Sequence, residues 1–258
     1  MRMAAPDFRL DGKTVAVTGA SRGIGAACAL ACAQAGAHAV VLLGRSPDAL
    51  AAVARRIERC GAEASIALCD VTCTASIRAA FDALARVDVL VNGAGANQPE
   101  PFAGVREETF DRLFALNVRG AFFATQAAVR VMRATDDRPA RPGTIIMISS
   151  QMGHVGAAQR SVYCATKHAI EGLTRALAVE LAPEGIRVLS IAPTFVRTAM
   201  TAAQLDDPEV GPALLGQIPL GRFGTVEEVA GAVVYAASPA AALMTGTSLV
   251  LDGGWTAR

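Results

Sequence analysis

The most constraining feature of the chain is a regular alternation between short apolar runs and longer helical patterns. Runs such as "TVAVTG", "HAVVLLG" and "IRVLSIAP" are each followed or preceded by an alanine-rich or amphipathic segment that ends at a glycine. The runs are continuously apolar and do not alternate with polar residues, which is typical of parallel strands covered on both faces. The sequence therefore predicts an α/β fold, in which a doubly wound parallel sheet carries helices on both faces.

The same patterns give approximate boundaries. Strands are expected at 14–19, 38–44, 63–71, 87–96, 144–150, 186–193 and 247–254, and helices at 23–37, 46–62, 76–87, 107–133, 161–182 and 225–238. The Pro-rich stretch 134–143 is expected to be an exposed loop, and the irregular stretch 194–224 a mobile lid over a substrate. No linker divides the chain, so residues 1–258 are expected to form one domain.

Composition excludes several classes of protein. A net charge of +1 gives no electrostatic footprint for nucleic acid, and no apolar run is long enough to cross a membrane. No secretory signal is visible, so a cytoplasmic location is expected. The six cysteines form no C-x-x-C pair and no histidines have metal-ligand spacing, so buried thiols and no metal site are expected.

A glycine loop, "TGASRGIG", lies between the first predicted strand and the first predicted helix. Gly19, Gly23 and Gly25 permit a tight turn and the close approach of a pyrophosphate to the helix N-terminus. The spacing is G-x-x-x-G-x-G. Its position between strand and helix indicates a Rossmann-like dinucleotide site.

The end of the second strand bears on which dinucleotide binds. NAD binding commonly uses an acidic residue there, whereas this chain has Gly44 followed by Arg45, with Arg22 in the glycine loop. Two guanidinium groups suit a 2′-phosphate, which favours NADP(H) over NAD(H), although both could be ordinary surface arginines. Asp70 follows the third strand and could accept a hydrogen bond from the adenine amino group, or cap a turn.

Tyr163 and Lys167 are four residues apart on a predicted helix and therefore share a face. An ammonium beside a phenol is expected to lower the phenol's pKa from about 10 and fit it for proton transfer during hydride transfer to a ketone. Taken alone, the pair could also be a helix-edge tyrosine and a solvated lysine. Ser150 could hold the substrate oxygen, and Asn117 is an awkward helix-interior residue that suggests a hydrogen-bonding role.

Together these motifs resemble the short-chain dehydrogenases/reductases in their compact single-domain branch. The resemblance runs from Lys13 to Trp255 and includes "NGAG" (92–95), "NVRG" (117–120) and "YCATK" (163–167) in the family's order. It implies a catalytic tetrad, with Tyr163 as acid/base, Lys167 tuning it and binding the nicotinamide ribose, Ser150 orienting the substrate and Asn117 holding a relay water. It also implies further dinucleotide contacts, from Ser21, Ile24, Val71, Asn92, Ala94, Gly95, Pro193, Val196 and Thr198.

Two motifs depart from the family pattern. The second asparagine usual in "NGAG" is Gly93, and the usual N-P-G is "APT", in which only Pro193 survives. These changes affect the expected motion of the lid more than the expected reaction.

The substrate is less constrained. The resemblance suggests pocket contacts from Gln98, Gln151, Met152, His154, Arg160 and Phe195. A cation at Arg160 would favour a carboxylate or a polyol, although it could also face solvent or a neighbouring subunit. The open alternatives are a 3-oxoacyl thioester reductase, a dehydrogenase of sugars or sugar acids, which the tail "LDGGWTAR" slightly favours, and a non-enzymatic dinucleotide-sensing regulator. Members of this branch are usually homotetramers, so that assembly is expected.

Overall fold

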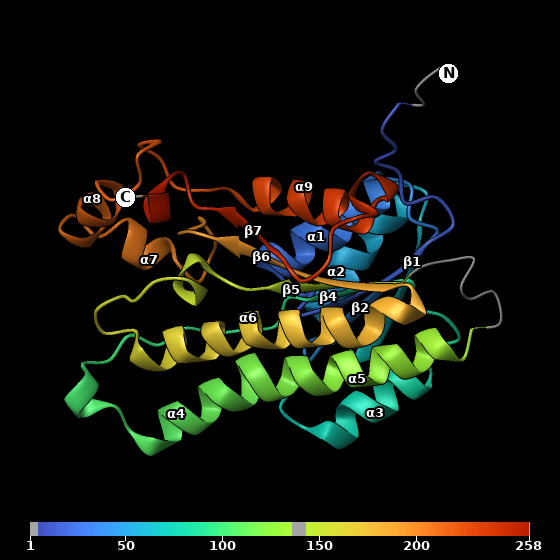
Figure 1. Cartoon of the computed structure of the whole chain (residues 1–258), viewed down its shortest axis with the longest axis horizontal. Helices are drawn as coiled ribbons and strands as arrows, with labels where there is room; N and C mark the ends of the chain where they lie inside the picture. The colour runs from blue at the N-terminus through green and yellow to red at the C-terminus, as the bar shows by residue number, and fades with distance from the viewer. Residues whose placement is uncertain (1–4, 136–142, 258) are drawn as a thin grey trace.

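A parallel sheet forms the centre of the molecule (Figure 1), and its strand order is β3-β2-β1-β4-β5-β6-β7. The computed structural model describes residues 5–135 and 143–257. Within them the strands are β1 (Thr14–Thr18), β2 (Ala39–Gly44), β3 (Glu63–Leu68), β4 (Val89–Asn92), β5 (Gly143–Ile148), β6 (Ile186–Pro193) and β7 (Ser248–Leu251). Every pairing is parallel, so the predicted doubly wound α/β fold is confirmed.

Helices connect the strands and cover both faces. They are α1 (Gly23–Gln34), α2 (Pro47–Glu58), α3 (Thr74–Asp82), α4 (Glu107–Phe114), α5 (Gly120–Arg133), α6 (Ser161–Leu181), α7 (Ala202–Leu205), α8 (Val210–Leu215) and α9 (Val226–Ala237). Short turns of helix are η1 (Phe102–Gly104), η3 (Gln151–Gly153), η4 (Ala182–Glu184), η5 (Pro239–Ala241) and η6 (Trp255–Ala257). None of the described helices is both long and apolar enough to span a membrane.

Two hydrophobic layers hold the helices to the sheet. Figure 1 shows α1, α2 and α9 on one face and α3, α4, α5 and α6 on the other. Val15 and Val17 of β1 belong to the first layer, whereas Ala16 between them belongs to the second. Successive side chains of a strand point to opposite faces, so one apolar run such as "TVAVT" supplies both layers.

Strand burial depends on position in the sheet. β1 and β4 are buried along their whole length, as the continuous apolar pattern predicts. The prediction of two-sided burial is wrong for β3, where Glu63, Ile66 and Leu68 are exposed. β3 is an edge strand and β7 is the other edge, so each has a neighbouring strand on one side only.

The switch in strand order lies between β1 and β4. From β1 the chain proceeds outward to β2 and β3, and then returns to β4 on the other side of β1. The connections diverge here and leave a crevice at the carboxyl ends of the strands, where ligands of such folds bind.

The helix predicted at 107–133 is interrupted. α4 and α5 are separated by η2 (Ala115–Arg119), a π-helical turn that contains Asn117. A Cβ on Gly120 would lie 2.8 Å from the carbonyl oxygen of Val71, so the chain approaches the end of β3 closely here. π-Turns insert one residue into a helix and often occur at functional sites, and no period in the sequence marks this one.

The predicted lid contains two short helices. α7 and α8 lie within 194–224 and, in Figure 1, near the C-terminal end of the chain. Of the predicted loop at 134–143, residues 136–142 lie outside the described part of the structure.

The cysteines divide by exposure. Cys28, Cys32 and Cys69 are buried, whereas Cys60 and Cys73 are exposed and only partly fit the prediction of buried thiols. Burial raises the pKa of Cys32 to about 12 and that of Cys69 to about 11, so both remain thiols near neutral pH. Among the described residues no group of three or more His, Cys, Asp or Glu side chains could hold a metal ion.

A threonine caps the N-terminus of α9 and gives a stability prediction. Thr225 Oγ1 accepts from the Glu228 N–H at 3.3 Å, and Glu228 Oε2 accepts from the Thr225 N–H at 2.9 Å. Thr225→Ala should lower the free energy of unfolding by about 1 kcal/mol because one of these bonds is lost. For a chain of this size the melting temperature should fall by about 2–4 °C, measured by circular dichroism.

Ser46→Ala is the matched control. Ser46 is the N-cap of α2, but its side chain makes no capping hydrogen bond. Its substitution should change the melting temperature much less. Equal decreases in melting temperature in the two variants would show that the capping hydrogen bonds of Thr225 do not stabilise the protein.

Candidate active site

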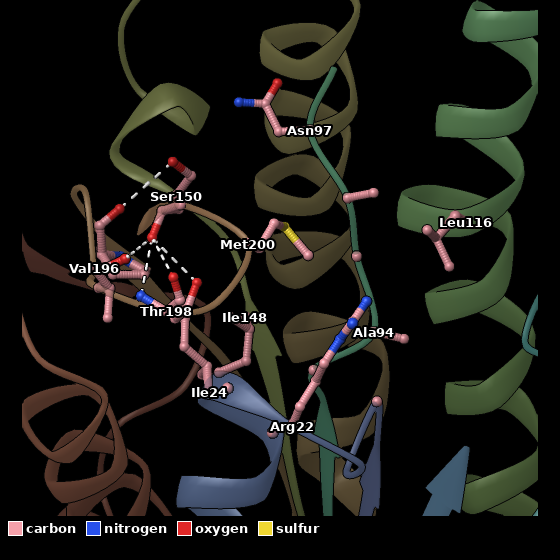
Figure 2. Close-up of a pocket in the computed structure, with 18 of the residues that line it drawn as sticks. Arg22, Ile24, Ala94, Asn97, Leu116, Ile148, Ser150, Val196, Thr198 and Met200 are labelled. Atoms are coloured by element: carbon pink, nitrogen blue, oxygen red, sulfur yellow. Dashed lines mark hydrogen bonds between the residues drawn. The ribbon is translucent and has the colours of Figure 1, made fainter. Parts of the chain in front are cut away.

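A cavity of about 320 Å³ opens at the carboxyl ends of the central strands. Its walls come from the glycine loop, the ends of β2 to β6, α6 and the first part of the lid. In Figure 2, Arg22 and Ile24 lie at one end of the cavity, Asn97 and Ser150 at the other, and Met200 of the lid between them. Segments far apart in the chain thus meet at the switch point between β1 and β4.

The glycine loop is shaped by close backbone contacts. Gly19 has a φ of +69°, and a Cβ there would lie 2.8 Å from the backbone N and Cα of Ala94. A Cβ on Gly25 would overlap the carbonyl oxygen of Gly19. Thr18 Oγ1 accepts from the N–H groups of Gly93 at 3.1 Å and Ala94 at 3.3 Å. The loop is therefore packed tightly against the end of β4 and leaves the N-terminus of α1 facing the cavity, as a pyrophosphate requires.

Two arginines lie at the dinucleotide end. Arg22 and Arg45 both line the cavity, and within the described residues neither forms an ion pair with a carboxylate. Asp70 also lines it, while its Oδ1 accepts from the Thr72 N–H at 2.9 Å and from the Thr72 hydroxyl at 2.7 Å. These hydrogen bonds, with a smaller effect of Arg45, lower the pKa of Asp70. Asp70 therefore shapes the turn and still faces the cavity.

Tyr163 and Lys167 both line the cavity from α6. Lys167 is 5% exposed, its Nζ donates to the Ile148 carbonyl at 2.8 Å, and it lies 5.6 Å from the centre of the Tyr163 ring. A solvated lysine is thereby excluded. The phenol and the ammonium are held on one face beside the end of β5.

The prediction that the Lys167 ammonium lowers the pKa of the Tyr163 phenol is wrong for this structure. Burial raises the pKa of Tyr163 to about 12, although the hydrogen bond with Ser150 opposes that rise. Burial also lowers the pKa of Lys167 to about 8. Desolvation disfavours both charged forms, and it outweighs the attraction that the spacing alone suggested. Near neutral pH the tyrosine is a phenol and the lysine is mainly an ammonium.

Ser150 lies at the start of η3, directly after β5. Its Oγ accepts from the Met152 N–H at 3.2 Å and lies 3.5 Å from the Pro193 carbonyl oxygen. Ser150 and Tyr163 therefore come together from different elements at one end of the cavity, as predicted.

Asn117 lies behind the cavity wall and connects two segments that form it. It is buried and does not line the cavity. Its side chain accepts from the Ala96 N–H and donates to the Ala96 carbonyl, both at 2.9 Å, and also donates to Thr166 Oγ1 at 3.1 Å. The predicted role in a water relay stays a prediction, whereas the observed bonds join the segment after β4 to α6.

Most of the predicted dinucleotide contacts face the cavity. Those that line it are Gly19, Ser21, Arg22, Gly23, Ile24, Gly25, Arg45, Asp70, Val71, Ala94, Gly95, Tyr163, Lys167, Pro193, Val196 and Thr198. Asn92 does not, because its Nδ2 donates to Thr125 Oγ1 at 2.9 Å and contacts Met147 Sδ at 3.3 Å inside the core. Asn92 therefore fixes β4 to α5 and β5.

The predicted substrate contacts divide into two groups. Gln151, Met152 and Phe195 line the cavity, and the Phe195 ring packs 5.6 Å from Trp255 near the C-terminus. Gln98, His154 and Arg160 do not line it. Their contact with a substrate stays a prediction, which their surroundings do not favour.

Each of the three is turned to other partners. Gln98 donates to Glu100 and accepts from Arg112 in the last turn of α4. His154 Nε2 lies 3.1 Å from Ser248 Oγ on β7. Arg160 is buried, and its guanidinium reaches the Gln159 carbonyl at 3.4 Å.

Several lining residues were missed. Asn97, Ser149 and Thr194 line the cavity near Ser150, and Met200 and Gln204 line it from the lid. Asn97 Oδ1, Ser149 Oγ, Thr194 Oγ1 and both amide atoms of Gln151 are buried with no hydrogen-bond partner in the described structure. Asn97 and Thr194 directly follow the "NGAGA" and "AP" segments, which is the signal that could have found them.

Comparisons with known proteins agree with this geometry. A family described as enoyl-(acyl carrier protein) reductase matches residues 19–256. D-threitol dehydrogenase of Mycolicibacterium smegmatis is 41% identical over 98% of this chain and 96% of its own length. L-xylulose reductase of Bos taurus is 36% identical over 97% of this chain and 99% of its own.

A solved structure shares the whole architecture. It is a gluconate 5-dehydrogenase from Burkholderia cenocepacia in complex with NADP and tartrate, 34% identical, with a TM-score of 0.91 and coverage of 98% of both chains. Fold and relatives agree, and the chain belongs to the short-chain dehydrogenases/reductases, in their single-domain branch.

Proposed function

We propose that the chain interconverts a polyol and the corresponding keto sugar, with NADP(H) preferred over NAD(H). The observation that carries this proposal is the polar, uncharged surface of the cavity around Ser150. Asn97, Gln151 and Thr194 line the cavity there and each has a buried polar atom without a partner, so rotation of these side chains toward a ligand would supply the missing hydrogen bonds. A chain of hydroxyl groups offers both donors and acceptors to these side chains.

Charge at the two ends favours a neutral substrate. Among the described lining residues the charged side chains are Arg22, Arg45, Asp70 and Lys167. The first three belong to the proposed dinucleotide end, and Lys167 is committed to the reaction. Since Arg160 does not line the cavity, no further cation is placed for a substrate carboxylate. The relatives acting on threitol, xylulose and galactitol support the neutral class.

Sugar acids are the second candidate. Structural relatives described as gluconate 5-dehydrogenase and as a putative 2-deoxy-D-gluconate 3-dehydrogenase, at 34% and 36% identity, are each solved with NADP. Neither a 3-oxoacyl thioester nor a purely dinucleotide-sensing role has comparable support in the polar lining and the intact tetrad.

In the proposed reaction Ser150 and Tyr163 bind the substrate oxygen. The dinucleotide, when bound, supplies the hydride in reduction and accepts it in oxidation. Tyr163, protonated near neutral pH, donates its proton to the oxygen as negative charge develops on it. Lys167 places its ammonium beside the phenol and the Ile148 carbonyl, where its charge stabilises the oxygen that has lost the proton.

The assembly and compartment are also proposed. Apolar side chains left exposed on α4, α5 and α6, in the turn after η5 and on β7 support the homotetramer, namely Phe110, Phe122, Val179, Leu243 and Val250. Light scattering should then give four times the 26.5 kDa mass.

The function is tested with purified protein and a substrate panel. NADPH oxidation should be fastest with neutral keto sugars of four to six carbons and at least tenfold slower, in kcat/KM, with keto sugar acids and 3-oxoacyl thioesters. A preference for keto sugar acids would favour the second candidate, and a preference for thioesters would refute both.

The acid/base role is tested by Tyr163→Phe. Turnover should fall at least about a hundredfold because the proton donor is lost, which is the usual size of a general acid–base contribution. NADPH binding, measured by fluorescence titration, should change little. Tyr235→Phe is the control, because Tyr235 lies on α9 outside the cavity. Retained turnover in Tyr163→Phe would remove the assignment.

The dinucleotide preference is tested by Arg45→Ala. Loss of a charge-assisted hydrogen bond to the 2′-phosphate should weaken NADPH binding by about tenfold or more and leave NADH binding nearly unchanged. The control is Arg59→Ala, an exposed arginine after α2 that does not line the cavity. An equal effect on both dinucleotides would show that Arg45 does not contact the phosphate.

A further inference from the structure

A buried carboxylate, Glu171, lies on α6 one turn beyond Lys167. It is 3% exposed and does not line the cavity. Tyr163, Lys167 and Glu171 are spaced by four residues, so the three side chains follow one face of the helix. The proposed reaction leaves Glu171 without a role.

The sheet edge supplies the partners of this carboxylate. Ser190 Oγ on β6 lies 2.9 and 3.0 Å from its two oxygens, and Ser248 Oγ on β7 lies 3.5 Å from Oε1. The two serines are register partners in the sheet. His154 Nε2 lies 3.5 Å from the same Oε1. A buried carboxylate remains ionised only where such donors or a cation stabilise it.

The segment that carries Ser150 packs on this part of α6. A Cβ on Gly153 would lie 3.0 Å from Ser149 Oγ, 3.1 Å from Glu171 Cγ and 3.1 Å from the Lys167 carbonyl oxygen. A side chain at this position would crowd all three atoms, and His154 follows Gly153 directly to reach the carboxylate. Glu171 therefore lies on the helix that holds Lys167 and packs against η3, the turn that follows Ser150.

Glu171 is the carboxylate whose charge acts on Lys167. Burial lowers the pKa of Lys167, and the negative charge of Glu171 opposes that change. Arg160 and Cys164 act on Tyr163. From the other elements, β5 offers the Ile148 carbonyl, η2 the Asn117 amide, and β6 and β7 the two serine hydroxyls; His154 is the titratable group at the carboxylate.

We infer that Glu171 is a positioning residue of the proposed reaction, whose carboxylate places a negative charge one turn of α6 from Lys167 and holds the Ser150 turn against α6. The inference rests on the roles proposed above for Tyr163 and Lys167. Glu171 touches neither substrate nor dinucleotide and acts through the lysine.

The test is the pH dependence of kcat/KM for reduction of a keto sugar. The ammonium form of Lys167 predominates below about pH 8 and is lost as the pH rises through that value, so the wild-type rate should fall on the alkaline side there. Removing the neighbouring charge in Glu171→Gln should move this fall to a measurably lower pH, because the charge favours the ammonium form. Glu171→Asp, which keeps the charge, should restore the wild-type profile in large part.

Two further variants separate this role from a structural one. Glu171→Met removes the charge without leaving an amide to satisfy, and should move the profile as Glu171→Gln does. Asp88→Asn changes another buried carboxylate, which accepts from the Thr14 N–H at 2.9 Å. Asp88 lies at the opposite end of the strands from the cavity. Asp88→Asn should lower the melting temperature and leave the pH profile in place.

Each outcome decides the inference. An unchanged alkaline limb in folded Glu171→Gln or Glu171→Met overturns it. If neither neutral variant folds while Glu171→Asp does, the role of Glu171 is structural and the inference is likewise overturned. If the wild type reduces no keto sugar, or Tyr163→Phe keeps its turnover, the proposed function fails first and the inference falls with it.

Discussion

The close contact between the glycine loop and the end of β4 is the constraint on which the site depends. Gly19 packs against the backbone of Ala94, and Thr18 Oγ1 accepts from the N–H groups of Gly93 and Ala94. This contact fixes the path of the chain as it leaves β4. Two residues later the Asn117 amide holds both backbone groups of Ala96. The glycine loop and the helix that carries Tyr163 and Lys167 are thereby joined.

The same series of hydrogen bonds continues into α6. Asn117 also donates to Thr166 Oγ1, and Thr166 donates in turn to the Tyr163 carbonyl at 2.7 Å. Every donor and acceptor in this series is buried or partly buried, so breaking one leaves another unpaired at a cost of about 1–3 kcal/mol. The π-helical turn at η2 is what directs Asn117 into the series, since an uninterrupted helix would rotate the residue away by about 100°.

Sequence patterns predicted the features that rest on local rules. Strand and helix alternation gave the sheet, the i, i+4 rule placed Tyr163 beside Lys167, and glycine spacing located the cradle. The π-helical turn, the burial of Arg160 and the attachment of Gln98 to α4 depend on contacts between distant segments. Nothing local to "AQRSVY" shows that the arginine turns away from the cavity.

The phenol shows how tertiary structure reverses a local expectation. In water the two groups have nearly equal pKa values, about 10 for the phenol and about 10.4 for the ammonium. Burial separates them to about 12 and about 8, because it opposes charge on both. The phenol is therefore protonated near neutral pH, as the proposed reduction requires, while the ammonium becomes the group nearest to titration. A desolvated ammonium is maintained by whatever negative charge lies within reach, and on α6 that charge is Glu171.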